Sequence, residues 1–107
     1  MGPWIVTTEE LEDASSLSIS LTVNGVKKQA SNTEQLIFSV AYLVSYLSRH
    51  TTLLPGAVIA TGTPGGVGFT RNPPEFLRPG DHVEVTVEGI GTLANPVIGD
   101  SLAPNST

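Results

Sequence analysis

The stretch LSISLTV-NG-VKKQA, residues 17–30, decides the fold of this chain. Apolar and polar residues alternate strictly over 17–23, and this period of two predicts a half-buried β-strand. Asn24-Gly25 then gives a strong hairpin signal, because a type I′ turn needs positive φ at both of its central residues. We therefore predict an antiparallel return strand over 26–30, with Lys27 and Lys28 toward solvent or at an edge of the sheet.

A second hairpin is predicted nearer the C-terminus. Residues 82–88 alternate with the valines on one face, and the glycines at 89 and 91 supply a turn or bulge before a returning strand over 92–98. A short apolar run predicts one further, buried strand over 57–61. The chain is therefore expected to be of the α+β class and β-rich, with a mixed or antiparallel sheet.

One main helix is predicted over residues 35–48. Capping-box spacing precedes it, either Ser31 with Glu34 or Asn32 with Gln35. Apolar residues then recur at helical spacing over more than one stripe, which predicts a well-buried helix. They are Leu36, Ile37, Val40, Ala41, Leu43, Val44 and Leu47, and Tyr42 and Tyr46 share one face for core or interface packing. A shorter helix start is predicted over 7–12, where acidic residues suit a helix N-terminus.

The stretch ATGTPGGVG, residues 60–68, is the candidate binding loop. Glycines let a ligand approach the main chain closely, and exposed backbone N–H groups and threonine hydroxyls can hold an anionic or carbonyl-bearing ligand. The residues RNPP at 71–74 cannot begin a helix, which argues against a dinucleotide-binding fold. The lysine of a Walker A motif is also absent.

Composition excludes several classes of function. The net charge is −5 and the five lysines and arginines form no basic stripe, so neither nucleic acid nor an anionic membrane is an expected partner. There is no cysteine, the two histidines lie far apart in the sequence, and no serine sits in a nucleophile elbow. Charged residues make up only 14% of the chain, which suggests that missing chain or a partner covers part of the surface.

The start of the chain carries little information about the cellular compartment. Met1 stands directly before Gly2-Pro3-Trp4, without the basic start and apolar run of a leader, and we interpret this as a cut edge. The compartment is left open between cytoplasm and mitochondrion.

A series of motifs recurs in the order and spacing of a known family. They are GPWIVT at 2–7, VNG at 23–25 with Gln29, SNT at 31–33, Ser48, LPG at 54–56, TGTPGGVG at 61–68, LRPGD at 77–81 and EGIG at 88–91. Together they resemble the C-terminal half of the catalytic domain of the fumarylacetoacetate hydrolase family. The resemblance predicts that residues 1–98 are part of such a domain and that 99–107 form a flexible polar tail. Ala57 stands where the family usually has aspartate.

The resemblance implies a β-rich roll, with one main buried helix, around a Mg²⁺ or Mn²⁺ site. Members cleave C–C bonds in β-diketo acids such as acylpyruvates, decarboxylate oxaloacetate, or isomerise related dienoates. It also implies that Thr63 contacts the substrate and that Gly62 completes the pocket wall. The family's metal ligands, a Glu-x-Glu pair and a later Asp, lie upstream of the matched region, as does its catalytic lysine. Glu10, Glu12 and Asp13 do not reproduce that motif.

Three hypotheses follow from this resemblance. The chain is a fragment of a metal-dependent enzyme and inactive alone, or a non-catalytic binding or interaction module, or a self-sufficient enzyme with relocated ligands. The expected partners are a small 2-keto or β-diketo acid and either a second copy, as a homodimer, or the missing N-terminal half. Exposed apolar edges would drive such association.

Overall fold

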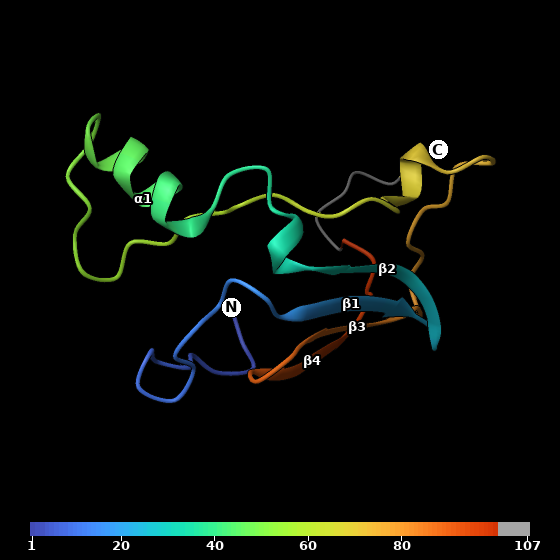
Figure 1. Ribbon diagram of the computed structural model, residues 1–107. Helices are drawn as coiled ribbons and strands as arrows, with labels where there is room; N and C mark the ends of the chain where they lie inside the picture. Colours follow the sequence, from blue (N-terminus) through green and yellow to red (C-terminus); the bar gives the residue numbers. More distant parts are fainter. Residues whose placement is uncertain (101–107) are drawn as a thin grey trace.

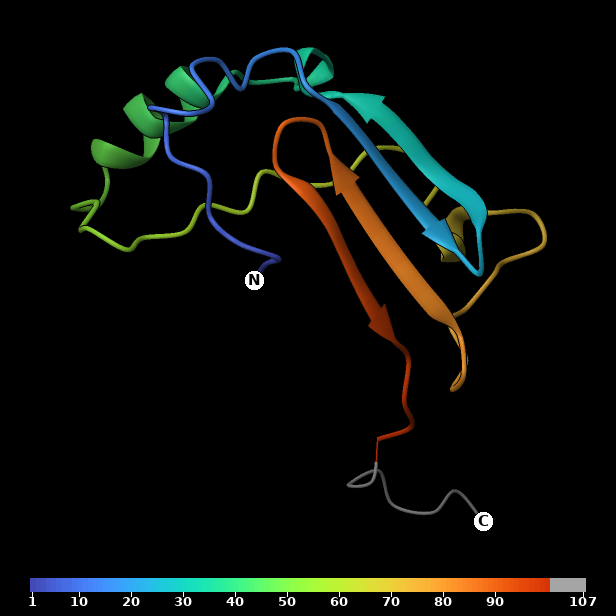
Figure 2. The same ribbon diagram turned by 90° about the horizontal axis from the view of Figure 1, so that it is seen from below.

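Four strands form the body of the protein, in a computed structural model that describes residues 1–100. The strands are β1 (Ser18–Val23), β2 (Val26–Asn32), β3 (His82–Val87) and β4 (Gly91–Pro96), and they lie in the order β2-β1-β3-β4 (Figures 1 and 2). All pairings in this sheet are antiparallel. Both predicted hairpins are therefore confirmed, and of the two sheet types expected the structure has the antiparallel one.

The turn of the first hairpin also ties this hairpin to the second. Asn24 and Gly25 have φ values of 51° and 78°, the positive pair that a type I′ turn needs. The Asn24 side-chain amide donates to Asp81 Oδ1 at 2.9 Å, and its oxygen accepts from the His82 N–H at 2.8 Å. The bond from Asn24, with one from the Arg78 backbone N–H, lowers the pKa of Asp81.

One face of the sheet is apolar and the other is polar. The strand register places Leu21 opposite Val85, and Val85 opposite Leu93, on a single face. Serine, threonine and glutamate alternate with these residues on the opposite face, as the period of two predicts. Among the described residues, only Leu17 is a buried hydrophobic residue, so the apolar face has little of its own chain packed over it.

The main helix is shorter than predicted. It is α1 (Val40–Ser48), and the Ser39 hydroxyl caps it by accepting from the Tyr42 N–H at 3.1 Å. The predicted start at 35 is wrong, because the Asn32 side chain caps a separate 3₁₀ turn, η1 (Thr33–Gln35), after which the backbone extends at Leu36. Two local caps therefore divide a stretch whose apolar spacing indicated one helix.

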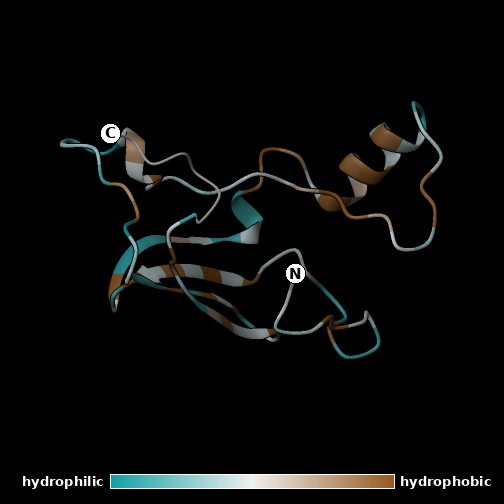
Figure 3. Ribbon diagram, turned by 180° about the vertical axis from the view of Figure 1, so that it is seen from behind, coloured by the Kyte–Doolittle hydropathy of each residue, from teal (hydrophilic) through white to brown (hydrophobic). Residues whose placement is uncertain are grey.

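The predicted burial of this helix is also wrong for the chain alone. No residue of α1 is buried, and Tyr42 and Tyr46 are each 51% exposed. The rings of Phe38, Tyr42, Tyr46 and His50 contact one another in sequence, with centroid separations of 5.0, 6.3 and 4.9 Å. This aromatic row lies on α1 and beside its two ends, and α1 extends beyond one end of the sheet (Figures 1 and 2). Most of the helix is coloured as hydrophobic in Figure 3.

Two smaller predictions are corrected. Residues 7–12 form a turn rather than a helix start, with the N–H groups of Glu10 and Leu11 both donating to the Thr7 carbonyl. Residues 57–61 form no strand, and Val58 is 68% exposed. A strand needs a neighbour to pair with, and within residues 1–100 no strand pairs with this segment. The predicted tail lies largely outside the described residues, which end at 100.

The molecule is expanded for its length. Its radius of gyration is 16.7 Å and its extents are 48 × 29 × 28 Å. A compact domain of this size has a radius of about 13 Å. The sheet and α1 thus leave apolar surface that the described residues do not cover. No helix within residues 1–100 is long and apolar enough to cross a bilayer.

Candidate functional site

A β-bulge in β2 positions the candidate loop. Leu21 pairs with Gln29 and Thr22 pairs with Lys27, so Lys28 is the extra residue of the bulge. An extra residue leaves its backbone groups outside the regular ladder. The Lys28 carbonyl finds its partner elsewhere, because the Arg71 guanidinium donates to it at 2.5 Å. This bond connects the middle of β2 to the segment that follows the binding loop.

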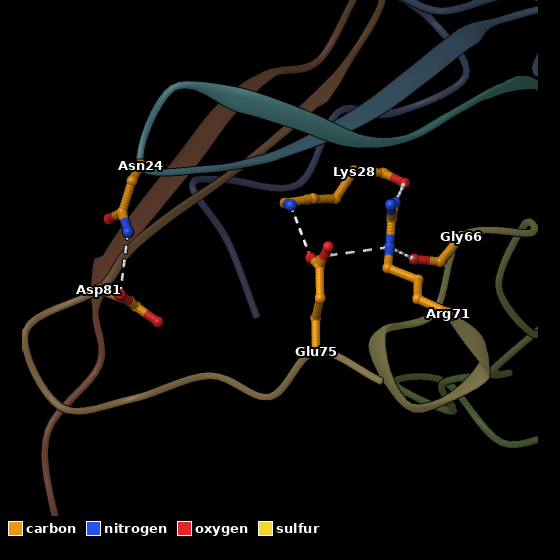
Figure 4. Close-up of polar contacts among 6 residues, drawn as sticks. All are labelled: Asn24, Lys28, Gly66, Arg71, Glu75 and Asp81. Carbon is orange, nitrogen blue, oxygen red and sulfur yellow. Dashed lines mark hydrogen bonds and ion pairs between the residues drawn. The ribbon is translucent and has the colours of Figure 1, made fainter. Parts of the chain in front are cut away.

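Gly66 lets the loop approach the bulge. Its φ is 104°, and a Cβ atom built on it would overlap the Lys28 carbonyl oxygen. The Gly66 carbonyl in turn accepts from Arg71 Nε at 3.1 Å (Figure 4). Arg71 therefore bridges two carbonyls, one on the strand and one on the loop, and a side chain at 66 would push them apart.

Glu75 completes the network around the bulge. Its carboxylate lies 2.6 Å from Lys28 Nζ and 3.9 Å from Arg71 Nε (Figure 4). The Glu75 N–H also donates to the Gly68 carbonyl at 2.9 Å, closing the turn that contains η2 (Gly68–Thr70). The hydrogen bond from Lys28 is the main reason that the pKa of Glu75 is lowered.

This lowered pKa predicts a pH dependence of stability. Because the pKa of Glu75 is lower in the folded chain than its ordinary value of 4.5, its contribution is fully present above that value. It is lost as the pH falls through the lowered folded pKa. We expect the free energy of unfolding of wild type to fall more steeply on acidification than that of Glu75→Gln.

Urea unfolding at a series of acidic pH values measures this difference. The wild-type and Glu75→Gln curves should converge at the acidic end, and the difference should shrink in high salt because the carboxylate is exposed. Two curves that stay parallel through the whole acid range would show that the ion pair with Lys28 does not affect folding.

The side chain of Gln29 donates hydrogen bonds to the binding loop at Thr63 and Pro64. Its side-chain nitrogen donates to Thr63 Oγ1 at 2.8 Å and to the Pro64 carbonyl at 2.7 Å. A carbonyl oxygen only accepts, so the amide nitrogen of Gln29 must face Pro64. Thr63 accepts from the same nitrogen, which leaves its own O–H available as a donor. The two residues are 34 positions apart in the sequence.

Two cavities flank Thr63. The second, of ≈ 450 Å³, is lined by Gly62, Thr63 and Pro64 of the loop and also by Ser31, Asn32 and Thr33, where β2 ends and η1 begins. The first, of ≈ 600 Å³, contains the Lys28, Arg71 and Glu75 network together with Phe69 and Phe76. Thr63 borders both cavities and Gly62 only the second. The two residues singled out by the resemblance thus share the second cavity.

The part of the site that sequence reasoning missed is the support behind the loop. Gln29 appeared only as a member of a motif, and Arg71 only in the stretch RNPP, which argued against a helix. Their contacts depend on the bulge at Lys28. The apolar alternation of β1, which pairs with β2 there, is regular and gives no sign of the bulge. The sequence offers one indirect signal, the glycine at 66 inside a loop that must touch another backbone.

The residues present do not fit a complete metal site. A hard cation takes about six oxygen ligands, more than one of them usually a carboxylate or water. Among residues 1–100, no three histidine, aspartate or glutamate side chains come together. His82 and Glu84, 3.3 Å apart on β3, are only a pair. A complete set of ligands for Mg²⁺ or Mn²⁺ is therefore not present among residues 1–100.

Comparison with known proteins gives a consistent match. The profile of the family described as fumarylacetoacetate (FAA) hydrolase C-terminal matches residues 1–98. Oxaloacetate tautomerase Fahd2a, mitochondrial, of Rattus norvegicus is 43% identical over 98 residues, which are 92% of this chain and 31% of that protein. Fumarylacetoacetate hydrolase from psychrophilic Exiguobacterium antarcticum superposes with a TM-score of 0.88 at 40% identity, covering 92% of this chain and 35% of that one.

A third relative was solved with ligands. Maleylpyruvate hydrolase from Sphingobium sp. SYK-6, in complex with manganese(II) ion and pyruvate, superposes with a TM-score of 0.81 at 35% identity. The match covers 91% of this chain and 34% of that one. The chain spans about a third of the length of the curated relatives it matches.

Proposed function

The chain belongs to the fumarylacetoacetate hydrolase C-terminal family, and from this premise we propose that it supplies one wall of a site for a small 2-keto or β-diketo acid. The proposed reaction class is C–C hydrolysis, decarboxylation, or isomerisation and tautomerisation, which covers the activities in the names of its relatives. Residues 1–98 would form the C-terminal part of the catalytic domain, in a β-roll completed by chain from elsewhere.

The observation that carries this proposal is the state of the Thr63 hydroxyl. It accepts from Gln29 and keeps its hydrogen free, next to the cavity that Gly62 also lines. The carboxylate of a 2-keto acid only accepts hydrogen bonds, so a fixed donor suits it. At Gly62, with a φ of 96°, a Cβ atom would meet nothing within 4 Å, which leaves the main chain open to a ligand. The relative solved with pyruvate supports this class of ligand.

The site needs a second polypeptide segment. The matched relatives are about three times as long as the region they share with this chain. The exposed aromatic row of α1 and the expanded shape leave surface for such a segment to cover. We infer that this segment, upstream in the same protein or on a second chain, carries the carboxylates that hold Mg²⁺ or Mn²⁺. When bound, such a metal would act as a Lewis acid toward the keto acid.

A second candidate is a non-catalytic ligand-binding module. The observation that favours it is the missing donor set, because within the described chain no cluster could hold a cation. Such a module would keep the binding loop and the cavity but would not turn over its ligand. Binding without turnover therefore distinguishes the two candidates.

The test grafts residues 1–98 onto the rat oxaloacetate tautomerase, in place of the segment that they match. We expect the graft, supplied with Mg²⁺ or Mn²⁺, to turn over oxaloacetate and to lose that activity in chelator, while the 107-residue chain alone shows no turnover. Chelator-sensitive turnover by the chain alone would contradict the proposal that its ligands lie elsewhere. A folded graft that binds pyruvate without turnover would favour the non-catalytic module.

A further inference from the structure

We propose that Gln29 is a positioning residue, which fixes the direction of the Thr63 hydroxyl without touching the ligand itself. Its side-chain nitrogen is the common donor to Thr63 Oγ1 and to the Pro64 carbonyl, at 2.8 and 2.7 Å. The inference rests on the proposed function only for the identity of the ligand. The geometry concerns this chain alone.

The direction of the Thr63 hydroxyl follows from the chemistry of its neighbours. A hydroxyl can either donate or accept, and what it faces decides which. Here the Pro64 carbonyl requires the nitrogen of Gln29 on its side, and that nitrogen has two hydrogens, one for each contact. Thr63 must then accept, and its hydrogen is directed away from Gln29. With an acceptor at position 29, the hydroxyl would turn round and donate inward.

Gln29 is itself held in place by the bulge. It immediately follows Lys28, whose carbonyl is bound by Arg71 and approached by Gly66. The strand at this point is therefore connected to the loop through both backbone and side chain. A partly buried amide on a fixed strand can orient a loop hydroxyl that has no other recorded partner among the described residues.

The first experiment needs no ligand. In the 107-residue chain, we expect the Gln29 side-chain amide protons to give shifted, slowly exchanging signals in ¹H–¹⁵N spectra. Thr63→Val should speed their exchange and move their shifts, while Thr61→Val, on the same loop, should leave them unchanged. Gln29 signals that look like those of a free glutamine, or that ignore Thr63→Val, would overturn the inference.

The second experiment uses pyruvate as the probe. It is a double-mutant cycle in which binding is followed by the chemical shift of the backbone amide of residue 63. Gln29→Met and Thr63→Val should each weaken pyruvate binding by roughly 10- to 150-fold, the usual scale for one hydrogen bond to a charged group. The double variant should be no weaker than Thr63→Val, because Gln29 acts through Thr63. Effects that multiply would show that Gln29 has its own role and would overturn the inference.

A third variant separates orientation from packing. Gln29→Glu keeps the shape of the side chain but presents only acceptors when ionised, so pyruvate binding should be weak near neutral pH. It should recover only in part as the pH falls, because the protonated carboxyl has one O–H donor for the two contacts that Gln29 makes, whereas Gln29→Met should show no such recovery. If the wild-type chain shows no shift with pyruvate at all, the proposed ligand is wrong for the isolated chain. The ligand-free exchange result then decides the role of Gln29.

Discussion

Gly66→Ala is expected to lower the free energy of unfolding by about 2–4 kcal/mol. A non-glycine residue at its φ of 104° is strained by about 1–2 kcal/mol. In addition, the new Cβ would overlap the Lys28 carbonyl oxygen, so the loop must move away from β2. The bonds from Arg71 would then lengthen, at a net cost of about 1 kcal/mol each.

Two neighbouring glycines provide matched controls. Gly62→Ala adds backbone strain without a clash, because its φ is 96° and a Cβ there meets nothing within 4 Å. Gly65→Ala adds neither, because its φ is not positive and the space around it is open. The urea midpoint should therefore be highest for Gly65→Ala, intermediate for Gly62→Ala and lowest for Gly66→Ala. Equal midpoints for the last two would mean that the contact with Lys28 contributes nothing to docking of the loop.

The parts of the fold that sequence reasoning predicted are those fixed by local chemistry. Alternation set the strands, and the Asn24-Gly25 dipeptide set the turn between β1 and β2, each within a few residues. The boundary of α1 was missed because capping by Ser39 competes with apolar spacing, and spacing alone does not rank the two. The predicted burial of α1 and of residues 57–61 was wrong for another reason. Burial depends on what lies against a segment, and residues 1–100 place nothing over these two.

The candidate site likewise has one part that could be predicted from the sequence and one part that could not. Its loop could be predicted, since Gly62 and Thr63 lie in one glycine-rich stretch. Its support could not, because Gln29 and Thr63 meet across 34 residues and only through the register of β2 at the bulge. A bulge depends on how two strands fit together, and neither strand's sequence records it by itself.

The second large effect is expected for Thr63→Val in the graft onto the rat oxaloacetate tautomerase. Valine has the shape of threonine but no hydroxyl, so the variant removes the free donor while filling the same space. A hydrogen bond to a charged group is worth about 1.5–3 kcal/mol, so kcat/KM for oxaloacetate should fall by about 10- to 150-fold. The effect should be larger than that of any other substitution at a threonine of the loop.

Thr61→Val is the control, since Thr61 lines the same cavity without a recorded hydrogen bond to Gln29. Thr61→Val should change kcat/KM by less than about threefold, the size of effect expected when a substitution removes no specific contact. Thr61→Val should unfold at the wild-type urea concentration. Thr63→Val should unfold at a slightly lower one, because it loses the hydrogen bond from Gln29 but leaves the contacts of Arg71 with the bulge in place. A Thr63→Val graft with wild-type kcat/KM would remove this hydroxyl from the site. The ligand would then be held by the loop's backbone amides, or by the neighbouring segment, and Gly62 rather than Thr63 would be the residue to test next.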